Sequence, residues 1–200
     1  MSVSSGDKLY TYGTKYNDTI YGRKEKDNIF GYNGNDTLYG NDGDDILNGG
    51  NDNDILIGGV GNDELKGDSG NDTYVYNLGD GFDTITDTGG NDKIKFGEGI
   101  NQNDLSFKTE GQNLKILINN NETAGIQISS QLQGGSKVVE TIEFHDGSTL
   151  DITNADQLIQ AMNSFGAETS SAMETLSDAV ENVSDMYSLA DNSDLTGKAA

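Results

Sequence analysis

Residues 31–75 read GYNGNDTLY GNDGDDILN GGNDNDILI GGVGNDELK GDSGNDTYV when the chain is divided every nine residues. Each nonapeptide begins with Gly, has Asp at its sixth position and has a large apolar residue at its eighth. Two less regular copies, GTKYNDTIY and GRKEKDNIF, precede them over residues 13–30. A period of nine suits neither a helix nor an isolated strand, whereas a short unit stacked on its own copies produces it. The sequence therefore predicts a repeat array.

The sixth position is aspartate in seven consecutive units. These residues are Asp18, Asp27, Asp36, Asp45, Asp54, Asp63 and Asp72. After Val75 the register slips, because Asp83 follows Asp72 by eleven residues and Asp92 follows Asp83 by nine. We interpret the segments around Asp83 and Asp92 as extra turns that close the array.

The composition is strongly acidic. The 200 residues include 12 Lys and Arg against 34 Asp and Glu, a formal charge of −22, with 32% hydrophobic residues and no Cys. Such a chain repels itself, so it folds only if something positive neutralises it. The charge argues against a nucleic-acid partner, and the lack of Cys excludes disulfides. Residues 1–10 lack a signal-peptide core, and no stretch reaches the roughly 20 apolar residues of a membrane span.

A row of carboxylates beside glycine-rich turns offers hard oxygen ligands for a metal. Calcium accepts six to eight oxygens in flexible geometry, whereas zinc prefers His or Cys. The single His is His145, which we interpret as flanking a turn. Aspartates in solvated turns are the simpler alternative, but seven in one register beside Gly favour calcium, in several ions.

The array resembles the β-roll of the repeats-in-toxin (RTX) family, whose glycine-rich nonapeptides bind calcium. The resemblance implies strands that alternate between two facing sheets, with ions between turns eighteen residues apart. Asp18, Asp36, Asp54 and Asp72 would then lie on one side, and Asp27, Asp45 and Asp63 on the other. The implied ligands are Gly31, Asn33, Gly34, Asp36, Gly40, Asp42, Gly43, Asp45, Gly49, Gly50, Asn51, Asp54, Gly58, Gly59, Gly61, Asp63, Gly67, Gly70 and Asp72, with Asp83, Asp92, Asp18 and Asp27.

The first two units depart from the RTX pattern. Tyr16 and Glu25 replace the glycine at the fourth position, and Arg23 brings a positive charge to the place where a cation should bind. We therefore expect these units to be caps with weak or absent sites, as terminal repeats often are. Asp52 replaces the same glycine in a central unit, which we expect to be tolerated because Asp adopts positive φ more readily than most residues.

Four segments follow from these patterns: a lead-in over 1–12, the calcium-binding β-roll over 13–97, a β-rich capping segment over 98–152 and a helical tail over 153–200. The third segment has short period-two runs separated by turn residues, which indicates a small antiparallel sheet continuing from the array. In the tail, Met173, Leu176, Val180, Val183 and Tyr187 form a coiled-coil-like seam. The expected class is mostly β with a helical end.

The segment after the repeats also resembles that of haemolysin-type RTX proteins, which end in an uncleaved signal for a type I (ABC-transporter) secretion system. The resemblance implies a secreted, extracellular protein that folds on calcium outside the cell and supports export of a larger toxin or hydrolase. Membrane contact would come only through such a parent protein. A second interpretation is a free-standing calcium-dependent adhesin, and the helical seam could equally mediate self-association. The short lead-in fits both a fragment and a small complete protein.

The sequence indicates no enzyme within these residues. No GxSxG, HExxH or P-loop motif is present. We interpret the pair Asp80 and Asp83 as part of a turn or a calcium site rather than an acid–base pair.

Overall fold

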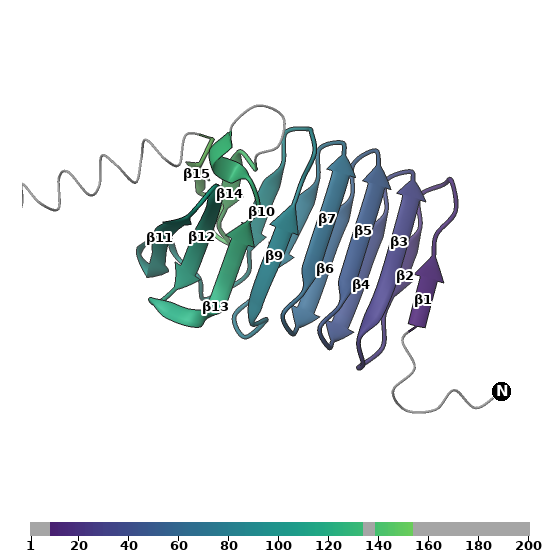
Figure 1. The fold of residues 1–200 in the computed structure, drawn as a ribbon, viewed down its shortest axis with the longest axis horizontal. Coiled ribbons are helices and arrows are strands. Elements are labelled where there is room, and N and C mark those ends of the chain that lie inside the picture. The colour runs from purple at the N-terminus through teal and green to yellow at the C-terminus, as the bar shows by residue number, and fades with distance from the viewer. Residues whose placement is uncertain (1–8, 134–138, 154–200) are drawn as a thin grey trace, which may run out of the picture. The chain divides into compact units, whose positions relative to one another are not determined.

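The computed structural model describes residues 9–133 and 139–153 (Figure 1). All of them belong to the first of two compact units of the chain, residues 1–156. The strands are β1 Leu9–Tyr12, β2 Thr19–Tyr21, β3 Asp27–Asn33, β4 Thr37–Asp42, β5 Ile46–Asn51, β6 Ile55–Val60, β7 Glu64–Ser69, β8 Thr73–Tyr76, β9 Phe82–Thr86, β10 Lys93–Phe96, β11 Leu105–Glu110, β12 Asn113–Ile118, β13 Asn121–Ile128, β14 Thr141–Glu143 and β15 Thr149–Asp151. Two short 3₁₀ helices cover Gln102–Asp104 and Gln131–Gln133.

Successive strands of the array alternate between two sheets, as the repeat predicted. One sheet has the order β1-β3-β5-β7-β9-β13-β12-β11, and the other has the order β15-β14-β10-β8-β6-β4-β2. Neighbouring array strands pair in parallel, so the chain winds as a roll with one sheet in front of the other (Figure 1). The parallel β-roll is thereby confirmed.

The register within each sheet follows the nonapeptide. Asn28 pairs with Ile46 and Thr37 with Ile55, an offset of 18 residues or two units. The offset becomes 20 where Glu64 pairs with Thr84, and again where Thr73 pairs with Lys93. The connection between β8 and β9 has two extra residues, and it lies between the paired residues in both cases. This single insertion therefore accounts for the longer offset in each sheet.

The narrow core lies between the sheets and is built by the apolar eighth positions. Ile29, Leu38, Leu47, Leu56, Leu65 and Tyr74 are at most 1% exposed, and Ile85 and Ile94 continue the stack. Each side chain packs on its copy from the next turn, so burial here depends on stacking several repeats. Ile20, in the second strand, is only partly buried.

The segment after the array extends both sheets instead of forming a sheet of its own. Strand β13 joins β9 in parallel and then pairs antiparallel with β12, which pairs with β11. Strand β14 joins β10 in parallel and pairs antiparallel with β15. The expected antiparallel strands are present, but each group enters the roll through a parallel joint. This segment therefore continues the roll's core across both layers.

The expected helical tail lies outside the described residues from 154 onward, so the architecture shown is a β-roll with almost no helix. Within the described ranges, no helix has the length and apolar character required to cross a bilayer.

Candidate metal centre

The repeat aspartates form two rows, one at each edge of the roll, where turns lead into strands. In each row, the backbone N–H of one aspartate donates to Oδ1 of the aspartate in the next turn on that side. One row links Asp18, Asp36, Asp54, Asp72 and Asp92, with N···O distances of 2.7 to 2.8 Å. The other row links Asp27, Asp45, Asp63 and Asp83, at 2.7 to 3.0 Å.

The second oxygen of most ladder aspartates is buried without a hydrogen-bond partner. These atoms are the Oδ2 atoms of Asp36, Asp45, Asp54, Asp63, Asp72 and Asp92. A buried carboxylate oxygen with no donor is costly, because its charge has lost water and gained nothing in return. A cation would satisfy all six. The arrangement therefore fits a series of calcium ions between turns.

The first glycine of each unit makes space for these oxygens. A Cβ added to Gly49 would overlap Oδ2 of Asp54. A Cβ added to Gly31 would overlap Oδ2 of Asp36 and would also lie 2.7 Å from the carbonyl oxygen of Gly49 in the next turn. Because the first residue is always glycine, a carboxylate oxygen and a backbone carbonyl oxygen can both lie against its Cα.

The turn backbone bears on the three substitutions at the fourth position that were noted in the sequence. Asp52 has a φ of 77°, the same positive region as Gly34 at 103° and Gly43 at 128° in other units. The expectation that Asp replaces glycine there is confirmed. Tyr16 and Glu25, at the same position in the first two units, do not have positive φ, so those turns follow a different path.

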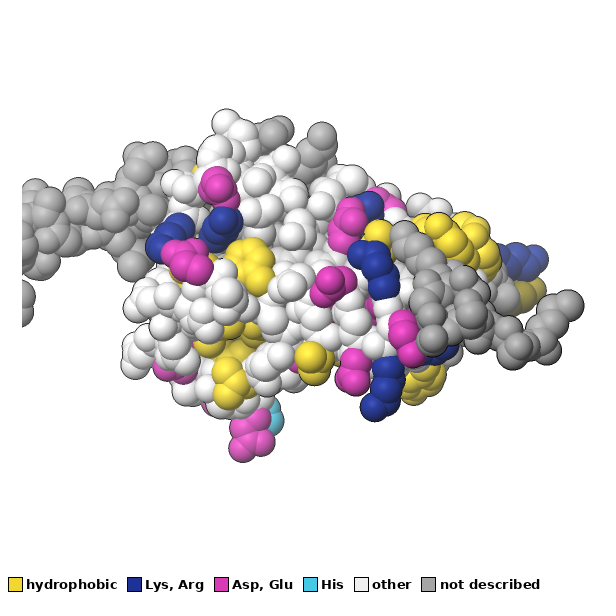
Figure 2. All heavy atoms as spheres, turned by 60° about the horizontal axis from the view of Figure 1, so that its bottom comes forward, with side chains coloured by type: hydrophobic (Ala, Val, Ile, Leu, Met, Phe, Trp, Pro, Cys, Tyr) yellow, Lys and Arg dark blue, Asp and Glu magenta, His cyan; other side chains and the backbone are white. Residues whose placement is uncertain are grey.

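Burial controls the electrostatics of the rows. Loss of water raises the pKa of Asp54 and Asp63 from 3.8 to about 7 and that of Asp45 and Asp72 to about 6, while the donated N–H partly opposes the rise. Neighbouring aspartates add a further increase. Ten aspartates are buried in the described residues. Figure 2 accordingly shows scattered acidic groups on this face, and no continuous acidic surface.

Asparagines at the fifth position form a second ladder that the sequence analysis missed. The backbone N–H of Asn35 donates to Oδ1 of Asn17, and the same contact joins Asn53 to Asn35, Asn71 to Asn53 and Asn91 to Asn71, at 2.7 to 2.9 Å. In this ladder the earlier residue accepts from the later one, whereas in the aspartate ladder the later residue accepts. On this edge the recurrent Asn-Asp pair therefore ties each inner turn to both of its neighbours. The repeated Asn was the signal for it.

The first two units satisfy their aspartates without a metal. Oδ2 of Asp18 accepts from the backbone N–H of Thr14 at 2.6 Å and from its hydroxyl at 2.8 Å. Asp27, fully buried, accepts from the N–H of Arg23 at 2.5 Å on Oδ2 and from its guanidinium at 3.0 Å on Oδ1. The positive charge next to Asp27 is thus the arginine itself, which agrees with a capping role for these units.

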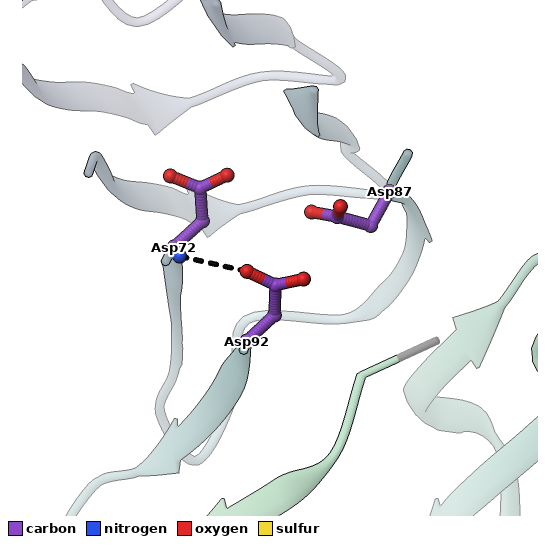
Figure 3. A group of neighbouring side chains, drawn as sticks. All are labelled: Asp72, Asp87 and Asp92. Carbon is purple, nitrogen blue, oxygen red and sulfur yellow. Dashed lines mark hydrogen bonds between the residues drawn. The ribbon is translucent and has the colours of Figure 1, made fainter. Parts of the chain in front are cut away.

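The far end of the array holds Asp87, which the sequence analysis left out, and Asp80, which it interpreted as part of a turn or a calcium site. Asp87 is buried next to Asp72 and Asp92, and carboxylate oxygens of the three lie within 4.8 Å of one another (Figure 3). Asp80 is also buried, and its Oδ2 accepts from the N–H of Asn77 at 2.6 Å. Asp87 breaks the nine-residue spacing of the ladder, so the periodic signal could not identify it.

Some predicted ligands lie apart from the rows. The side chains of Asn33, Asp42 and Asn51 are exposed. Asn51 donates to Asn33 at 2.7 Å, and Lys24 lies 3.8 Å from Asp42. Only the backbone carbonyls of these three residues remain as candidate ligands. The side chains that point into the spaces between turns are those of the sixth-position aspartates.

Comparison with known proteins agrees with this geometry. The family model described as the RTX calcium-binding nonapeptide repeat matches four times, over residues 12–47, 39–74, 48–82 and 75–102. The array is a set of RTX calcium-binding repeats. The RTX array binds several calcium ions, and repeats of this kind are typically non-catalytic and secreted. A second model, the haemolysin-type calcium binding protein related domain, matches residues 113–154.

Individual relatives share only parts of the RTX chain. The iron-regulated protein FrpA of Neisseria meningitidis serogroup C is 35% identical over 95 residues, which are 44% of this chain and 8% of that protein. The crystal structure of the extracellular lipase LipA from Serratia marcescens is similar over 64% of this chain and 38% of that one, with 17% identity and a TM-score of 0.29. The chain thus spans a small part of the curated relative.

Proposed function

We propose that this RTX chain is a calcium-dependent folding module that folds outside the cell and supports type I secretion of a larger exported protein. The observation that carries the proposal is the set of six buried aspartate oxygens without a donor. In the absence of a cation these oxygens make the closed roll costly, so the calcium level would decide whether the array folds.

The residues of each turn would act together in this switch. The Oδ1 ladder aligns the carboxylates, the first glycine leaves room beside them, and the Asn ladder fixes the spacing between turns. Bound calcium would supply the positive charge that the rows lack. Because the ladder exists only in the folded roll, binding free energy would become folding free energy.

The proposed place of folding follows from typical affinities. Extracellular calcium modules bind at about 10⁻⁴ to 10⁻³ M, well above cytosolic calcium. The array would therefore remain unfolded inside the cell, in a form that a transporter can thread, and fold on release. We assign the export signal to residues 153–200, the roll to 13–97 and its cap to 98–152. The chain would have no catalytic activity of its own.

Calcium titration of the purified chain, followed by circular dichroism, tests the switch. We expect a disordered spectrum in excess chelator and a cooperative gain of β structure at submillimolar to millimolar calcium. Export is tested separately by deleting residues 153–200 in a host that carries a type I transporter, with secretion measured in the medium. A chelated protein that keeps its β spectrum would contradict the folding proposal.

A second candidate function is a calcium-dependent adhesin, favoured by exposed aromatic rings at the first turns, one group on each sheet. Tyr12, Tyr21 and Tyr32 are each at least half exposed. Their rings stack, with centroids 6.2 Å apart for Tyr12 and Tyr32 and 4.6 Å apart for Tyr21 and Tyr39. Exposed ring faces are suited to binding partners. Calcium-dependent adhesion to whole cells that is lost in a Tyr12→Ala, Tyr21→Ala, Tyr32→Ala variant would favour this function.

A further inference from the structure

The last turn on one edge of the roll differs from all the others. Asp72 precedes β8, Asp92 precedes β10, and Asp87 follows β9, so three strands direct one carboxylate each into a common space (Figure 3). All three residues are at most 3% exposed. Oδ2 of Asp72 and Oδ2 of Asp92 are buried without a partner.

Asp87 stands at a position of the turn that is glycine in the nonapeptide units. Residues 87–92 read DTGGND, whereas the preceding unit on this edge begins GDSGND at Gly67. Asp87 thus stands at the first position, which is Gly in all seven nonapeptide units. A Cβ on Gly67 would lie 2.6 Å from Oδ2 of Asp87, so this carboxylate reaches into the gap between the two turns.

The carboxylate of Asp87 is held in position by donors. The hydroxyl of Tyr74 donates to Oδ2, and the N–H of Gly89 donates to Oδ1 at 2.8 Å. The Tyr74 hydroxyl accepts in turn from the N–H of Gly67 at 2.9 Å. Tyr74 stands at the eighth position, where other units have Leu or Ile, so its hydroxyl is an addition specific to this turn. Each carboxylate oxygen retains a further lone pair for a metal.

The spacing suits one calcium ion. Calcium–oxygen distances are about 2.3 to 2.6 Å, so two oxygens on one ion can be up to about 5 Å apart. Oxygens of the three carboxylates lie within 4.8 Å of one another. Magnesium, at about 2.0 to 2.1 Å in a strict octahedron, would require the three strands to move closer.

We propose that Asp72, Asp87 and Asp92 form a three-carboxylate calcium site that binds more tightly than the sites between the other turns and fills first. The inference rests on the proposed calcium-dependent folding. Charge count among the ligands raises calcium affinity, and this gap has one more carboxylate than the regular gaps. The site also closes the array, because the N–H of Asp92 donates to Oε2 of Glu140 at 2.6 Å, 48 residues away.

The test compares Asp87→Asn with Asp68→Asn in the full chain, by calorimetric titration with calcium alone. Asp68 is a partly buried neighbour at the same edge, so the control removes the same charge outside the triad. We expect Asp87→Asn to weaken the tightest site by about tenfold or more, as is usual for disturbed metal ligation. Asp68→Asn should leave that site within about twofold of the wild type.

Terbium provides a second readout, which reports where the first ion binds. The chain has no Trp, so tyrosine sensitises the bound lanthanide. The first equivalent of terbium should give strong emission in the wild type and weak emission in Tyr74→Phe, which keeps the ring but loses the phenol.

Three results decide between the proposals. Loss of the tightest site in Asp87→Asn together with dim emission in Tyr74→Phe supports the triad. If Asp87→Asn binds its first ion as tightly as the wild type and still folds with calcium, the triad is overturned and the folding proposal stands. If the wild type neither binds calcium nor folds with it, both fail.

Discussion

The carboxylate of Asp72 receives the backbone N–H of Asp54 on Oδ1 at 2.7 Å and keeps Oδ2 buried without a protein donor. One oxygen thus aligns the turn, and the other is available to a cation. The same division between a hydrogen-bonded Oδ1 and a buried Oδ2 without a donor recurs at Asp36, Asp45, Asp54, Asp63 and Asp92. A single residue type can therefore stack the turns and still offer an oxygen to a metal.

Asp54→Asn should weaken calcium-dependent folding without harming the calcium-free chain. The amide keeps an acceptor for the N–H of Asp36 but places a neutral group at the metal position. We expect fewer bound ions and a loss of roughly 3 kcal/mol at calcium about 100 times its dissociation constant. Calorimetric stoichiometry and urea unfolding in calcium measure both.

The matched control is Asp44→Asn. Asp44 is exposed, and its Oδ1 accepts from the N–H of Asn62, a bond that an amide oxygen preserves. It should bind the same number of ions as the wild type. An equal loss of ions in both variants would show that overall charge, and not the ladder position, controls binding.

The calcium-free fold should lose stability as the pH rises from about 4 to 7. Burial raises the pKa of Asp54 and Asp63 from 3.8 to about 7, so the folded chain binds protons more tightly than the unfolded chain. This contribution is complete below the unfolded pKa and is lost as the pH rises through the folded pKa. Circular dichroism in chelator between pH 4 and pH 8 measures it, as a folded fraction that falls toward the disordered spectrum when the pH rises.

The effect of calcium should depend on pH in the opposite direction. The calcium concentration at which half of the chain is folded should be lower at pH 8 than at pH 5, because protons compete for the same oxygens. A double variant, Asp54→Asn with Asp63→Asn, should flatten the pH dependence of the calcium-free fold. If the calcium-free fold were more stable at pH 8 than at pH 5, buried Asp54 and Asp63 would not be the source of its pH dependence.

Arg23→Ala should destabilise the roll in a way that calcium partly repairs. The guanidinium is 3.0 Å from Oδ1 of the fully buried Asp27, and its removal leaves a buried charge alone. Such a loss costs about 3 to 5 kcal/mol. We expect a lower melting temperature at fixed calcium and a rise in the number of bound ions by one at high calcium.

Lys24→Ala serves as the comparison for Arg23. Its ammonium is 85% exposed and 3.8 Å from Asp42, so its loss should change stability by less than about 1 kcal/mol. If both variants melt alike, the guanidinium does not replace a cation at Asp27.

Asn53→Ala should lower the free energy of unfolding of the folded roll without changing the number of calcium ions that it binds. It removes the acceptor for the N–H of Asn71, a contact of 2.7 Å on the exposed edge. A single such hydrogen bond contributes about 0.5 to 1.5 kcal/mol. Urea unfolding at saturating calcium measures the loss, and Asn103→Ala, an exposed Asn outside the array, should be close to neutral. A reduced calcium stoichiometry in Asn53→Ala would contradict the separation of the two ladders.

The repeat itself predicted much of the site. A nine-residue period places every second Asp at the same edge, and an apolar eighth position two residues later points between the sheets, as Leu38 and Leu56 do. These relations follow from local geometry repeated at fixed intervals, so a single sequence contains them. The unusual charge at Arg23 likewise marked the cap before any contact was known.

The tertiary structure decided the features that have no period. Asp87 joins Asp72 and Asp92 because it stands where Gly67 stands one turn earlier, at the register of 20 residues that the longer connection between β8 and β9 produces. Glu140 ends the aspartate ladder from 48 residues away, and β13 and β14 enter the two sheets through parallel joints. The sequence by itself determined the rows of aspartates, because they repeat along the chain. Only the folded structure decided where the rows begin, end and gain a third carboxylate, because those contacts join residues that no spacing relates.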